Sequence, residues 1–239
     1  MEIRRFYSTQ IDEYSGAVQI DGDEFVHMTK VLRYKVGYKA VVFANDGFEY
    51  DCTVKEIGRD FAVLGIDSKR AVDKKNVRLV LYAGLLKNNK LDLVVQKGVE
   101  LGVDEIIPFT SANCAESKFS KERANKIALE SAKQCGAVYL SKVNDLISFE
   151  EVVNQIKLYD RVIIANENER ERTIPSVLEK CRTIALIIGP EGGFKASEIN
   201  AAREAGALSV TLGKRILRAE TASIITSALV LYGIGELSY

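Results

Sequence analysis

The sequence predicts an α/β protein in which a small β-barrel precedes a mostly parallel α/β domain, and three features of the chain indicate this. Residues 1–70 read as short strands separated by turns, which is typical of a small barrel. From about Asp73 onward, apolar strands alternate with helical segments, which indicates a parallel sheet with helices on both faces. The charged stretch 67–76 separates the two patterns, so we expect the domain boundary there.

The barrel prediction depends on a hairpin signal. Val41–Phe43 and Tyr50–Val54 are apolar runs joined by a turn that contains Asn45-Asp46-Gly47, where glycine tolerates a positive φ. Further strands are expected at 17–20 and 61–66, and one helix at about 23–32.

In the second part, helices are recognised by apolar spacing and by their end signals. Leu91, Val94, Val95 and Val99 recur at helical spacing before Gly102, and Ser148 opens a capping box with Glu151. A further helix, capped by Ser120, is expected to carry Ala124, Ile127, Ala128 and Ser131 on one face. Further helices are expected at 175–181, 196–205 and 220–232, and strands at 77–83, 103–109, 160–165, 183–188 and 208–212.

Composition sets broad limits on function. The 239 residues hold 33 basic and 33 acidic side chains and are 47% hydrophobic, which excludes disordered, collagen-like and coiled-coil proteins. No apolar run is long enough to span a membrane, and the first residues lack a signal peptide's apolar stretch, so we expect a soluble, cytoplasmic protein. Zero formal charge excludes an indiscriminate polycation. Taken alone, the balanced charge counts against a nucleic-acid partner, because affinity for phosphates normally needs an excess of basic side chains. The cations are nevertheless clustered, at 4–5, 30–35, 69–78 and 214–218.

Histidine and cysteine are scarce. His27 is the single histidine, so a metal site built from several histidines is excluded, and any catalytic triad would have to use it. The four cysteines form no C-x-x-C pair, and we expect free thiols and no metal.

Glycine-rich or polar segments follow three of the predicted strands. They are Ala165–Glu167, Gly189–Phe194 and Leu212–Thr221. Ligands of parallel α/β domains bind at the carboxyl ends of strands, and glycines let the backbone approach a ligand closely. None of the three has the spacing of a P-loop or of a dinucleotide-binding loop. The alternative for Gly189–Gly193 is a plain strand-to-helix turn.

Several motifs, spread in order over essentially the whole chain, resemble those of one family. The sequence is similar to the RsmE family of the SPOUT superfamily, the uracil-N(3)-methyltransferases of small-subunit (16S) ribosomal RNA. The motifs are Arg4-Arg5-Phe6, His27–Arg33, Gln96–Val103 with Ile107-Pro108, Glu130–Gly136, Ile188–Phe194 with Glu198-Ile199, and Leu212–Thr221.

The resemblance implies a fold, a cofactor and partners. The implied fold is a PUA-like β-barrel that binds RNA over residues 1–70, and a SPOUT α/β domain with a C-terminal trefoil knot over 74–239. S-adenosylmethionine is the implied cofactor, and such enzymes are usually homodimers with the site near the partner subunit. The implied partner is 16S rRNA or the small ribosomal subunit.

The resemblance and the three strand ends together give the expected site. The cofactor-binding residues are Ala165, Asn166, Glu167, Gly189, Pro190, Glu191, Gly192, Gly193, Leu212, Gly213, Ile216 and Leu217. The RNA-binding residues are Arg4, Arg5, His27, Lys30, Arg33, Gln96 and Lys97. For His27 the alternative is a buried structural histidine; for Arg4 and Arg5 it is a solvated strand end, and for Gln96 and Lys97 a structural surface role.

The expected chemistry needs an anion stabiliser and a proton acceptor. Arg218 is expected to stabilise the uracil anion that forms when N3 loses its proton, because a guanidinium is permanently charged. Glu191 or Glu220 is expected to accept that proton if burial raises its pKa. The alternative is that Glu191 caps backbone amides and that Glu220 caps the last helix.

Two positions depart from the family pattern. Ala137 stands where similar sequences usually carry an arginine, and Lys195 stands where a helix-capping serine or threonine is common. Two other functions stay open. One is a SPOUT methyltransferase with another target, although Ile216-Leu217-Arg218 replaces the S-L-N motif typical of 2′-O enzymes. The other is a non-catalytic RNA-binding assembly factor.

Overall fold

A computed structural model describes residues 3–87 and 89–237 of the chain. The described chain divides into two compact units. The first runs to Lys74 and also takes in Ala132–Leu140, and the second holds the remainder. The segment Ala132–Leu140 lies outside the range 1–70 that the sequence predicts for the first domain.

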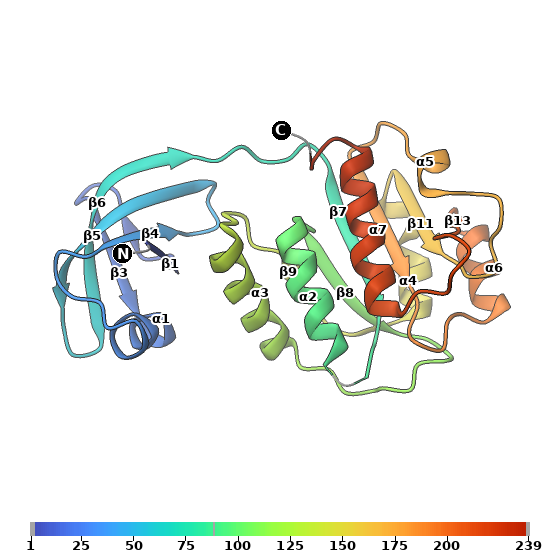
Figure 1. Ribbon diagram of the computed structural model, residues 1–239, viewed down its shortest axis with the longest axis horizontal. Helices are drawn as coiled ribbons and strands as arrows, with labels where there is room; N and C mark the ends of the chain where they lie inside the picture. Colours follow the sequence, from blue (N-terminus) through green and yellow to red (C-terminus); the bar gives the residue numbers. More distant parts are fainter. Residues whose placement is uncertain (1–2, 88, 238–239) are drawn as a thin grey trace. The chain divides into compact units, whose positions relative to one another are not determined.

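The first unit is a six-stranded sheet that curls into a half-barrel (Figure 1). Its order is β1-β4-β5-β6-β3-β2, and the outer strands β1 and β2 are not paired with each other. The predicted hairpin is confirmed, because β4 and β5 pair antiparallel with Val42 opposite Tyr50. The strands are β1 (Arg4–Tyr7), β2 (Ile11–Asp12), β3 (Ala17–Asp21), β4 (Lys39–Phe43), β5 (Phe48–Ile57) and β6 (Phe61–Ala71).

The predicted helix of this unit is also present. It consists of α1 (Gly22–Val26) and a π-helical turn, His27–Val31, and it buries Phe25 and Met28 in the core of the half-barrel. The segment Ala132–Leu140 is bound to this unit by a nearly buried ion pair, in which Lys133 Nζ lies 2.6 Å from Glu24 Oε1.

The second unit is a parallel sheet with the order β10-β8-β7-β12-β11-β13, as the alternation of strands and helices predicts. The central strands are almost wholly buried, since helices cover both faces of the sheet. The strands are β7 (Arg78–Gly84), β8 (Glu105–Thr110), β9 (Lys142–Val143), β10 (Ile147–Ser148), β11 (Arg161–Ala165), β12 (Thr183–Ile188) and β13 (Leu208–Val210).

The helices begin and end at the expected signals. Gly102 ends one helix at a φ of 86°, and the Ser148 hydroxyl accepts from the Glu151 amide in a capping box. The helix predicted over 175–181 is only one turn long. The helices are α2 (Lys90–Leu101), α3 (Lys121–Cys135), α4 (Phe149–Gln155), α5 (Ile174–Val177), α6 (Ala196–Glu204) and α7 (Ala219–Gly233).

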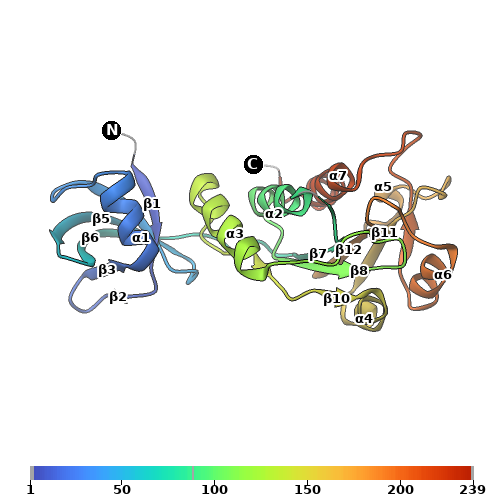
Figure 2. The same cartoon turned by 90° about the horizontal axis from the view of Figure 1, so that it is seen from below.

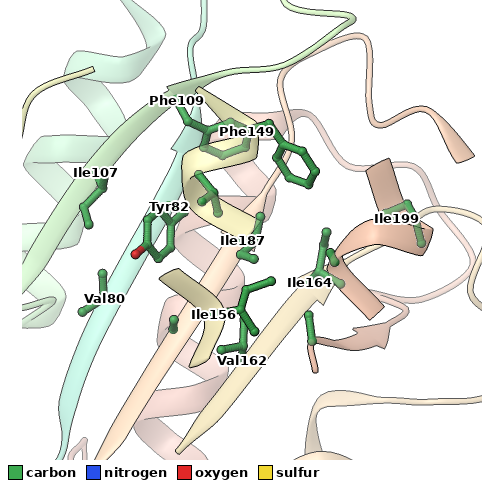
Figure 3. Close-up of a cluster of buried hydrophobic side chains, with 14 residues drawn as sticks. Val80, Tyr82, Ile107, Phe109, Phe149, Ile156, Val162, Ile164, Ile187 and Ile199 are labelled. Carbon is green, nitrogen blue, oxygen red and sulfur yellow. The ribbon is translucent and has the colours of Figure 1, made fainter. Parts of the chain in front are cut away.

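Helices α2 and α7 cover one face of this sheet and α4 and α6 the other (Figure 2). On the α4–α6 face, Phe109, Phe149 and Ile187 belong to one buried apolar cluster (Figure 3). Such burial contributes roughly 25 cal/mol per Å² of apolar surface. No helix in the described ranges combines the length and apolarity needed to cross a bilayer.

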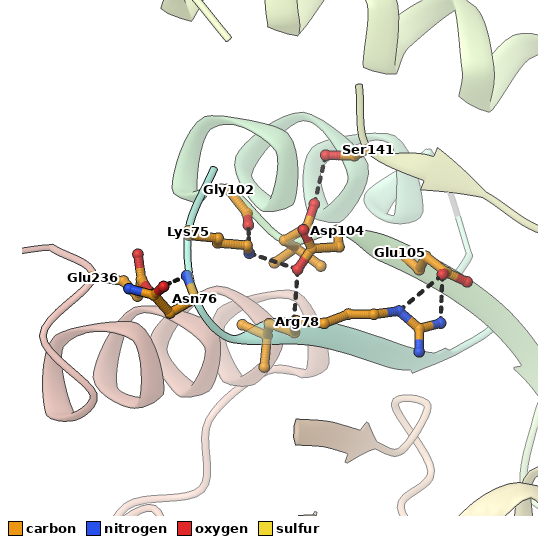
Figure 4. Close-up of polar contacts among 10 residues, drawn as sticks. Lys75, Asn76, Arg78, Gly102, Asp104, Glu105, Ser141 and Glu236 are labelled. Carbon is orange, nitrogen blue, oxygen red and sulfur yellow. Dashed lines mark hydrogen bonds and ion pairs between the residues drawn. The ribbon is translucent and has the colours of Figure 1, made fainter. Parts of the chain in front are cut away.

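Polar contacts stabilise the edge of the parallel sheet at which β7 and β8 begin (Figure 4). Asp104 accepts from the Leu79 amide at 2.6 Å and pairs with Lys75, while Arg78 pairs with Glu105. These charged side chains therefore pair with one another at the amino ends of β7 and β8.

Candidate functional site

The three polar strand ends meet in one cleft of about 780 Å³ at the carboxyl edge of the parallel sheet. Eleven of the twelve residues expected to bind cofactor line this cleft, and Gly192 does not. Arg218 lines it as well, at the residue that precedes α7. The lining residues from the expected set are Ala165, Asn166, Glu167, Gly189, Pro190, Glu191, Gly193, Leu212, Gly213, Ile216 and Leu217.

The loop after β12 approaches the end of β7 more closely than any side chain would permit. A Cβ placed on Gly84 would lie 2.4 Å from the backbone nitrogen of Pro190 and 2.7 Å from the carbonyl carbon of Gly189. Gly189 in turn has the ring of Phe194 against it, with a hypothetical Cβ only 2.9 Å from the ring. Glycine at these positions therefore places the backbone of this loop at the wall of the cleft.

Contacts from the rest of the unit stabilise the same loop. Asn113 Nδ2 donates to the carbonyl of Gly192 at 3.0 Å, and Phe194 stacks parallel to Phe109 with the ring centroids 6.2 Å apart. Glu198 accepts from the backbone amides of Ala112 and Lys195, at 2.9 and 2.8 Å. The Glu198 carboxylate thus caps α6, so the loop does not need a serine or threonine at Lys195.

Glu191 is bound at the first turn of α2. Its carboxylate accepts from the Lys87 amide at 3.2 Å and from Lys90 Nζ at 3.0 Å. Burial raises the pKa of Glu191, but the hydrogen bonds from Lys90, from its own amide and from Lys87 outweigh burial and hold the pKa below its usual value. A general base would need the opposite shift. The catalytic role of Glu191 stays a prediction, and its contacts favour the structural alternative.

The loop after β11 is ordered by its own polar groups. The Asn166 amide donates to the carbonyl of Val210 at 2.9 Å, and its side-chain amide donates to Ser209 Oγ at 3.2 Å. Arg170 Nη1 donates to the carbonyl of Glu167, which leaves the exposed Glu167 carboxylate at the cleft.

The loop after β13 is the most open wall of the cleft. Gly213 has a φ of 110° with nothing within 4 Å of a hypothetical Cβ, and Ile216 is 82% exposed. The exposed Arg218 guanidinium has no hydrogen-bond partner among the described residues. The apolar and cationic side chains of this loop are therefore available to a ligand.

Glu220 lies two residues further on, in the first turn of α7, and does not line the cleft. It is 9% exposed, and its Oε2 atom is buried without a hydrogen-bond partner.

The expected RNA-binding residues lie in both units. In the first unit, Arg4, Lys30 and Arg33 are exposed. His27 is partly buried, and its ring lies edge-on to Phe6 at 6.4 Å. Arg5 is mostly buried, as its side chain is 16% exposed.

Arg5 is paired with the buried Glu49 and lies over the ring of Phe43. These contacts favour a structural role for Arg5. In the second unit, Gln96 is exposed on α2, and Lys97 pairs with Glu100 one turn along the same helix at 2.8 Å.

Sequence reasoning missed four residues around the cleft, namely Gly84, Lys90, Asn113 and Arg170. Gly84 carried a usable signal, because a glycine directly after a predicted central strand indicates close backbone approach. The others become neighbours of the cleft only through tertiary structure.

Comparison with known proteins agrees with this geometry. A family described as RNA methyltransferase domain matches residues 73–231, and one described as RNA methyltransferase PUA domain matches 20–67. The chain is 30% identical to ribosomal RNA small subunit methyltransferase E of Bacillus subtilis, over 96% of this chain and 92% of that protein. The chain belongs to the ribosomal RNA small subunit methyltransferase E family.

Other members of the methyltransferase E family match along their whole length. The Rickettsia conorii protein is 28% identical and is covered over 96% of both chains. The crystal structure of the Neisseria gonorrhoeae enzyme, bound to S-adenosyl methionine, superposes with a TM-score of 0.89 at 26% identity, covering 99% of this chain and all of that one. The predicted order of a PUA-like domain before a parallel α/β methyltransferase domain is confirmed. The predicted β-barrel is a curled sheet that forms a half-barrel, and the trefoil knot stays a prediction.

Proposed function

We propose that this protein transfers a methyl group from S-adenosylmethionine to N3 of a specific uridine in 16S rRNA. The observation that carries the proposal is the single cleft in which three strand-end loops meet, in a member of the methyltransferase E family. Its volume of about 780 Å³ lies within the roughly 300–1,000 Å³ of small-molecule sites.

The cleft residues fit such a cofactor. The walls at Gly189, Gly193 and Gly213 present backbone, which can hydrogen-bond the edges of a nucleoside. The exposed carboxylate of Glu167 offsets part of the positive charge of a sulfonium and an ammonium group. S-adenosylmethionine, when bound, supplies an activated methyl group, so the protein has to align the acceptor and to handle its proton.

Arg218 is the residue that we expect to act on the acceptor. Loss of the N3 proton spreads negative charge onto the two flanking uracil carbonyl oxygens, and a positioned guanidinium stabilises that charge. In the described chain the Arg218 guanidinium lines the cleft without a competing acceptor.

Substitution tests this role of Arg218. Arg218→Ala should abolish methyl transfer to small subunits in a radiolabelled methyl assay, while calorimetry shows S-adenosylmethionine binding close to that of the unmodified protein. Retained turnover would remove Arg218 from the mechanism.

We assign RNA binding chiefly to residues 1–70 and cofactor binding to 74–239, because the PUA-type match and the cleft lie in these respective parts. Exposed cations in the first part, Arg4, Lys30 and Arg33, supply phosphate contacts. Each cation that contacts a phosphate contributes roughly one unit to the salt slope of binding. Lys30→Ala should therefore reduce the slope of the logarithm of the RNA-binding constant against the logarithm of salt concentration. An unchanged slope would exclude a phosphate contact by Lys30.

We further propose a homodimer that uses α7. Ile225, Leu229 and Tyr232 are 42%, 47% and 70% exposed, and their spacing puts them on one face of this helix. Leu229→Asp should shift the protein toward monomers in analytical ultracentrifugation. Leu158→Asp, at an even more exposed leucine outside this face, is the matched control. Equal behaviour of the two variants would contradict the interface.

We also propose that the enzyme works in the cytoplasm, because its proposed substrate is ribosomal RNA.

A further inference from the structure

The Glu220 carboxylate is unusual among the acidic groups at helix starts in this protein. It is 9% exposed, Oε2 is fully buried, and neither oxygen accepts a hydrogen bond within the described chain. By contrast, Glu198 and Glu151 each accept from backbone amides at the starts of α6 and α4. Glu220 therefore does not act as a hydrogen-bonded cap of this kind.

Among the residues that the structure describes, no cation is paired with Glu220 either. The elements packed against α7 are α2, α5, β7 and β12. Their charged and titratable side chains are satisfied elsewhere. The pairs are Lys90 with Glu191, Asp92 with Arg123, Lys97 with Glu100, Arg78 with Glu105, and Tyr82 with Gln155 and Tyr159.

A buried carboxylate without a partner is costly, and native proteins rarely keep one without a reason. The positive end of the α7 dipole compensates only part of that cost. Ala219 and Ala222, in the same turn of the helix, line the cleft, and so does Arg218 just before it. The orphaned acid thus lies in the same helical turn as residues that line the cleft, although it does not line the cleft itself.

Resting on the proposed function, we propose that Glu220 is the general base that takes the N3 proton of the target uracil through a water molecule, because the carboxylate does not itself line the cleft. The N3–H bond breaks, and its proton goes to the Glu220 carboxylate. The electron pair left on N3 forms the bond to the methyl carbon, and the bond from that carbon to sulfur breaks, which turns the sulfonium into a thioether. The proton then leaves the Glu220 carboxyl group to solvent.

The structure favours Glu220 over Glu191 for this role. Glu191 is hydrogen-bonded to Lys87 and Lys90, and its pKa is lowered. Glu220 is nearly buried, and its Oε2 atom has no hydrogen-bond partner in the described chain, so it is free to accept a proton.

The experiment compares Glu220→Gln, Glu220→Asp and a matched control, Glu122→Gln. Glu122 is an exposed glutamate in the first turn of α3, so its substitution also removes a carboxylate at a helix start but far from the cleft loops in sequence. Cofactor affinity is measured by calorimetry with S-adenosylmethionine. Single-turnover methylation of small subunits from a strain that lacks the gene is measured across pH.

We expect Glu220→Gln to bind the cofactor like the unmodified protein and to react about 10²- to 10⁴-fold more slowly at neutral pH. The deficit should shrink as pH rises, because alkaline solution ionises the uracil without a base. Glu220→Asp should keep part of the rate and the shape of the pH profile, and Glu122→Gln should match the unmodified protein.

Two results would overturn the proposal. One is an unchanged rate in Glu220→Gln. The other is a loss of the same size at every pH, which indicates a structural role. Absence of methylation by the unmodified protein would instead refute the proposed function itself, so the two failures are distinguishable.

Discussion

Adding one methyl group at Gly84 should push the loop after β12, which contains Gly189 and Pro190, away from the end of β7. A Cβ at this position would lie 2.4 Å from Pro190 N and 2.7 Å from both Gly189 C and Pro190 Cδ. Two of these three atoms are backbone, so the contact cannot be relieved by a side-chain rotation. In Gly84→Ala, either the end of β7 or the loop after β12 has to move.

The size of the effect follows from the cost of overpacking. Inserting a methyl group into a packed site costs about 1–3 kcal/mol, and each kcal/mol lowers Tm by about 2–4 °C in a protein of this size. We therefore expect Tm to fall by about 2–12 °C. If the displacement of the loop weakens the binding free energy of S-adenosylmethionine by about 1.4 kcal/mol or more, the affinity falls at least tenfold. Thermal unfolding and calorimetric titration measure the two effects.

Gly98→Ala is the matched control for this experiment. Gly98 is also buried in the second unit, but a Cβ there would meet the flexible end of Ile106, at 2.9 Å, and no loop of the cleft. The control should change cofactor affinity little. If Gly84→Ala bound the cofactor as tightly as Gly98→Ala does, the close approach of β7 and the loop would not control the site.

Three further outcomes are expected. Asn113→Ala removes the hydrogen bond to the carbonyl of Gly192, so S-adenosylmethionine affinity measured by calorimetry should fall about two- to tenfold; equal affinity would contradict a role in loop order. Burial raises the pKa of Glu49, but its hydrogen bonds from arginine outweigh burial and lower it. The ionised Glu49 carboxylate therefore stabilises the folded protein at pH values above its pKa in the unfolded chain. This stabilisation is lost as the pH falls through the lower pKa that Glu49 has in the folded protein. Urea unfolding of Glu49→Gln should show lower stability at neutral pH and a flatter acid dependence, and an unchanged acid limb would refute this. Ser148→Ala removes half of the capping box with Glu151 and should cost about 0.5–2 kcal/mol in the same assay; no loss would show that the cap is dispensable.

Local signals predicted most of the fold. The hairpin at 41–54, the capping box at Ser148 and the stop at Gly102 depend on turn and cap chemistry that a short segment carries by itself. The predicted helix at 175–181 was too long, because the chain is already extended at Leu178, with a φ of −78° and a ψ of 124°.

The site was predictable where one loop carried its own signal. The glycines in Gly189–Gly193 and at Gly213 indicate that the backbone can approach a ligand closely, and both loops line the cleft. The cationic motif at Arg4-Arg5 gave no such information, because the partner of Arg5 is Glu49, 44 residues away. Residue types alone do not reveal which arginine is exposed and which is paired.

The unpaired state of Glu220 was likewise invisible in the sequence. A glutamate in the first turn of a helix reads as a cap, and only the packed structure shows that no donor reaches it.

The most direct test of the central claim is nucleoside mass spectrometry of 16S rRNA. Small subunits from a strain lacking the gene are treated with the purified protein and S-adenosylmethionine, and untreated subunits serve as the control. We expect one uridine to become 3-methyluridine in the treated sample alone. Methylation on a ribose 2′-oxygen, or no new methyl group at all, would contradict the account.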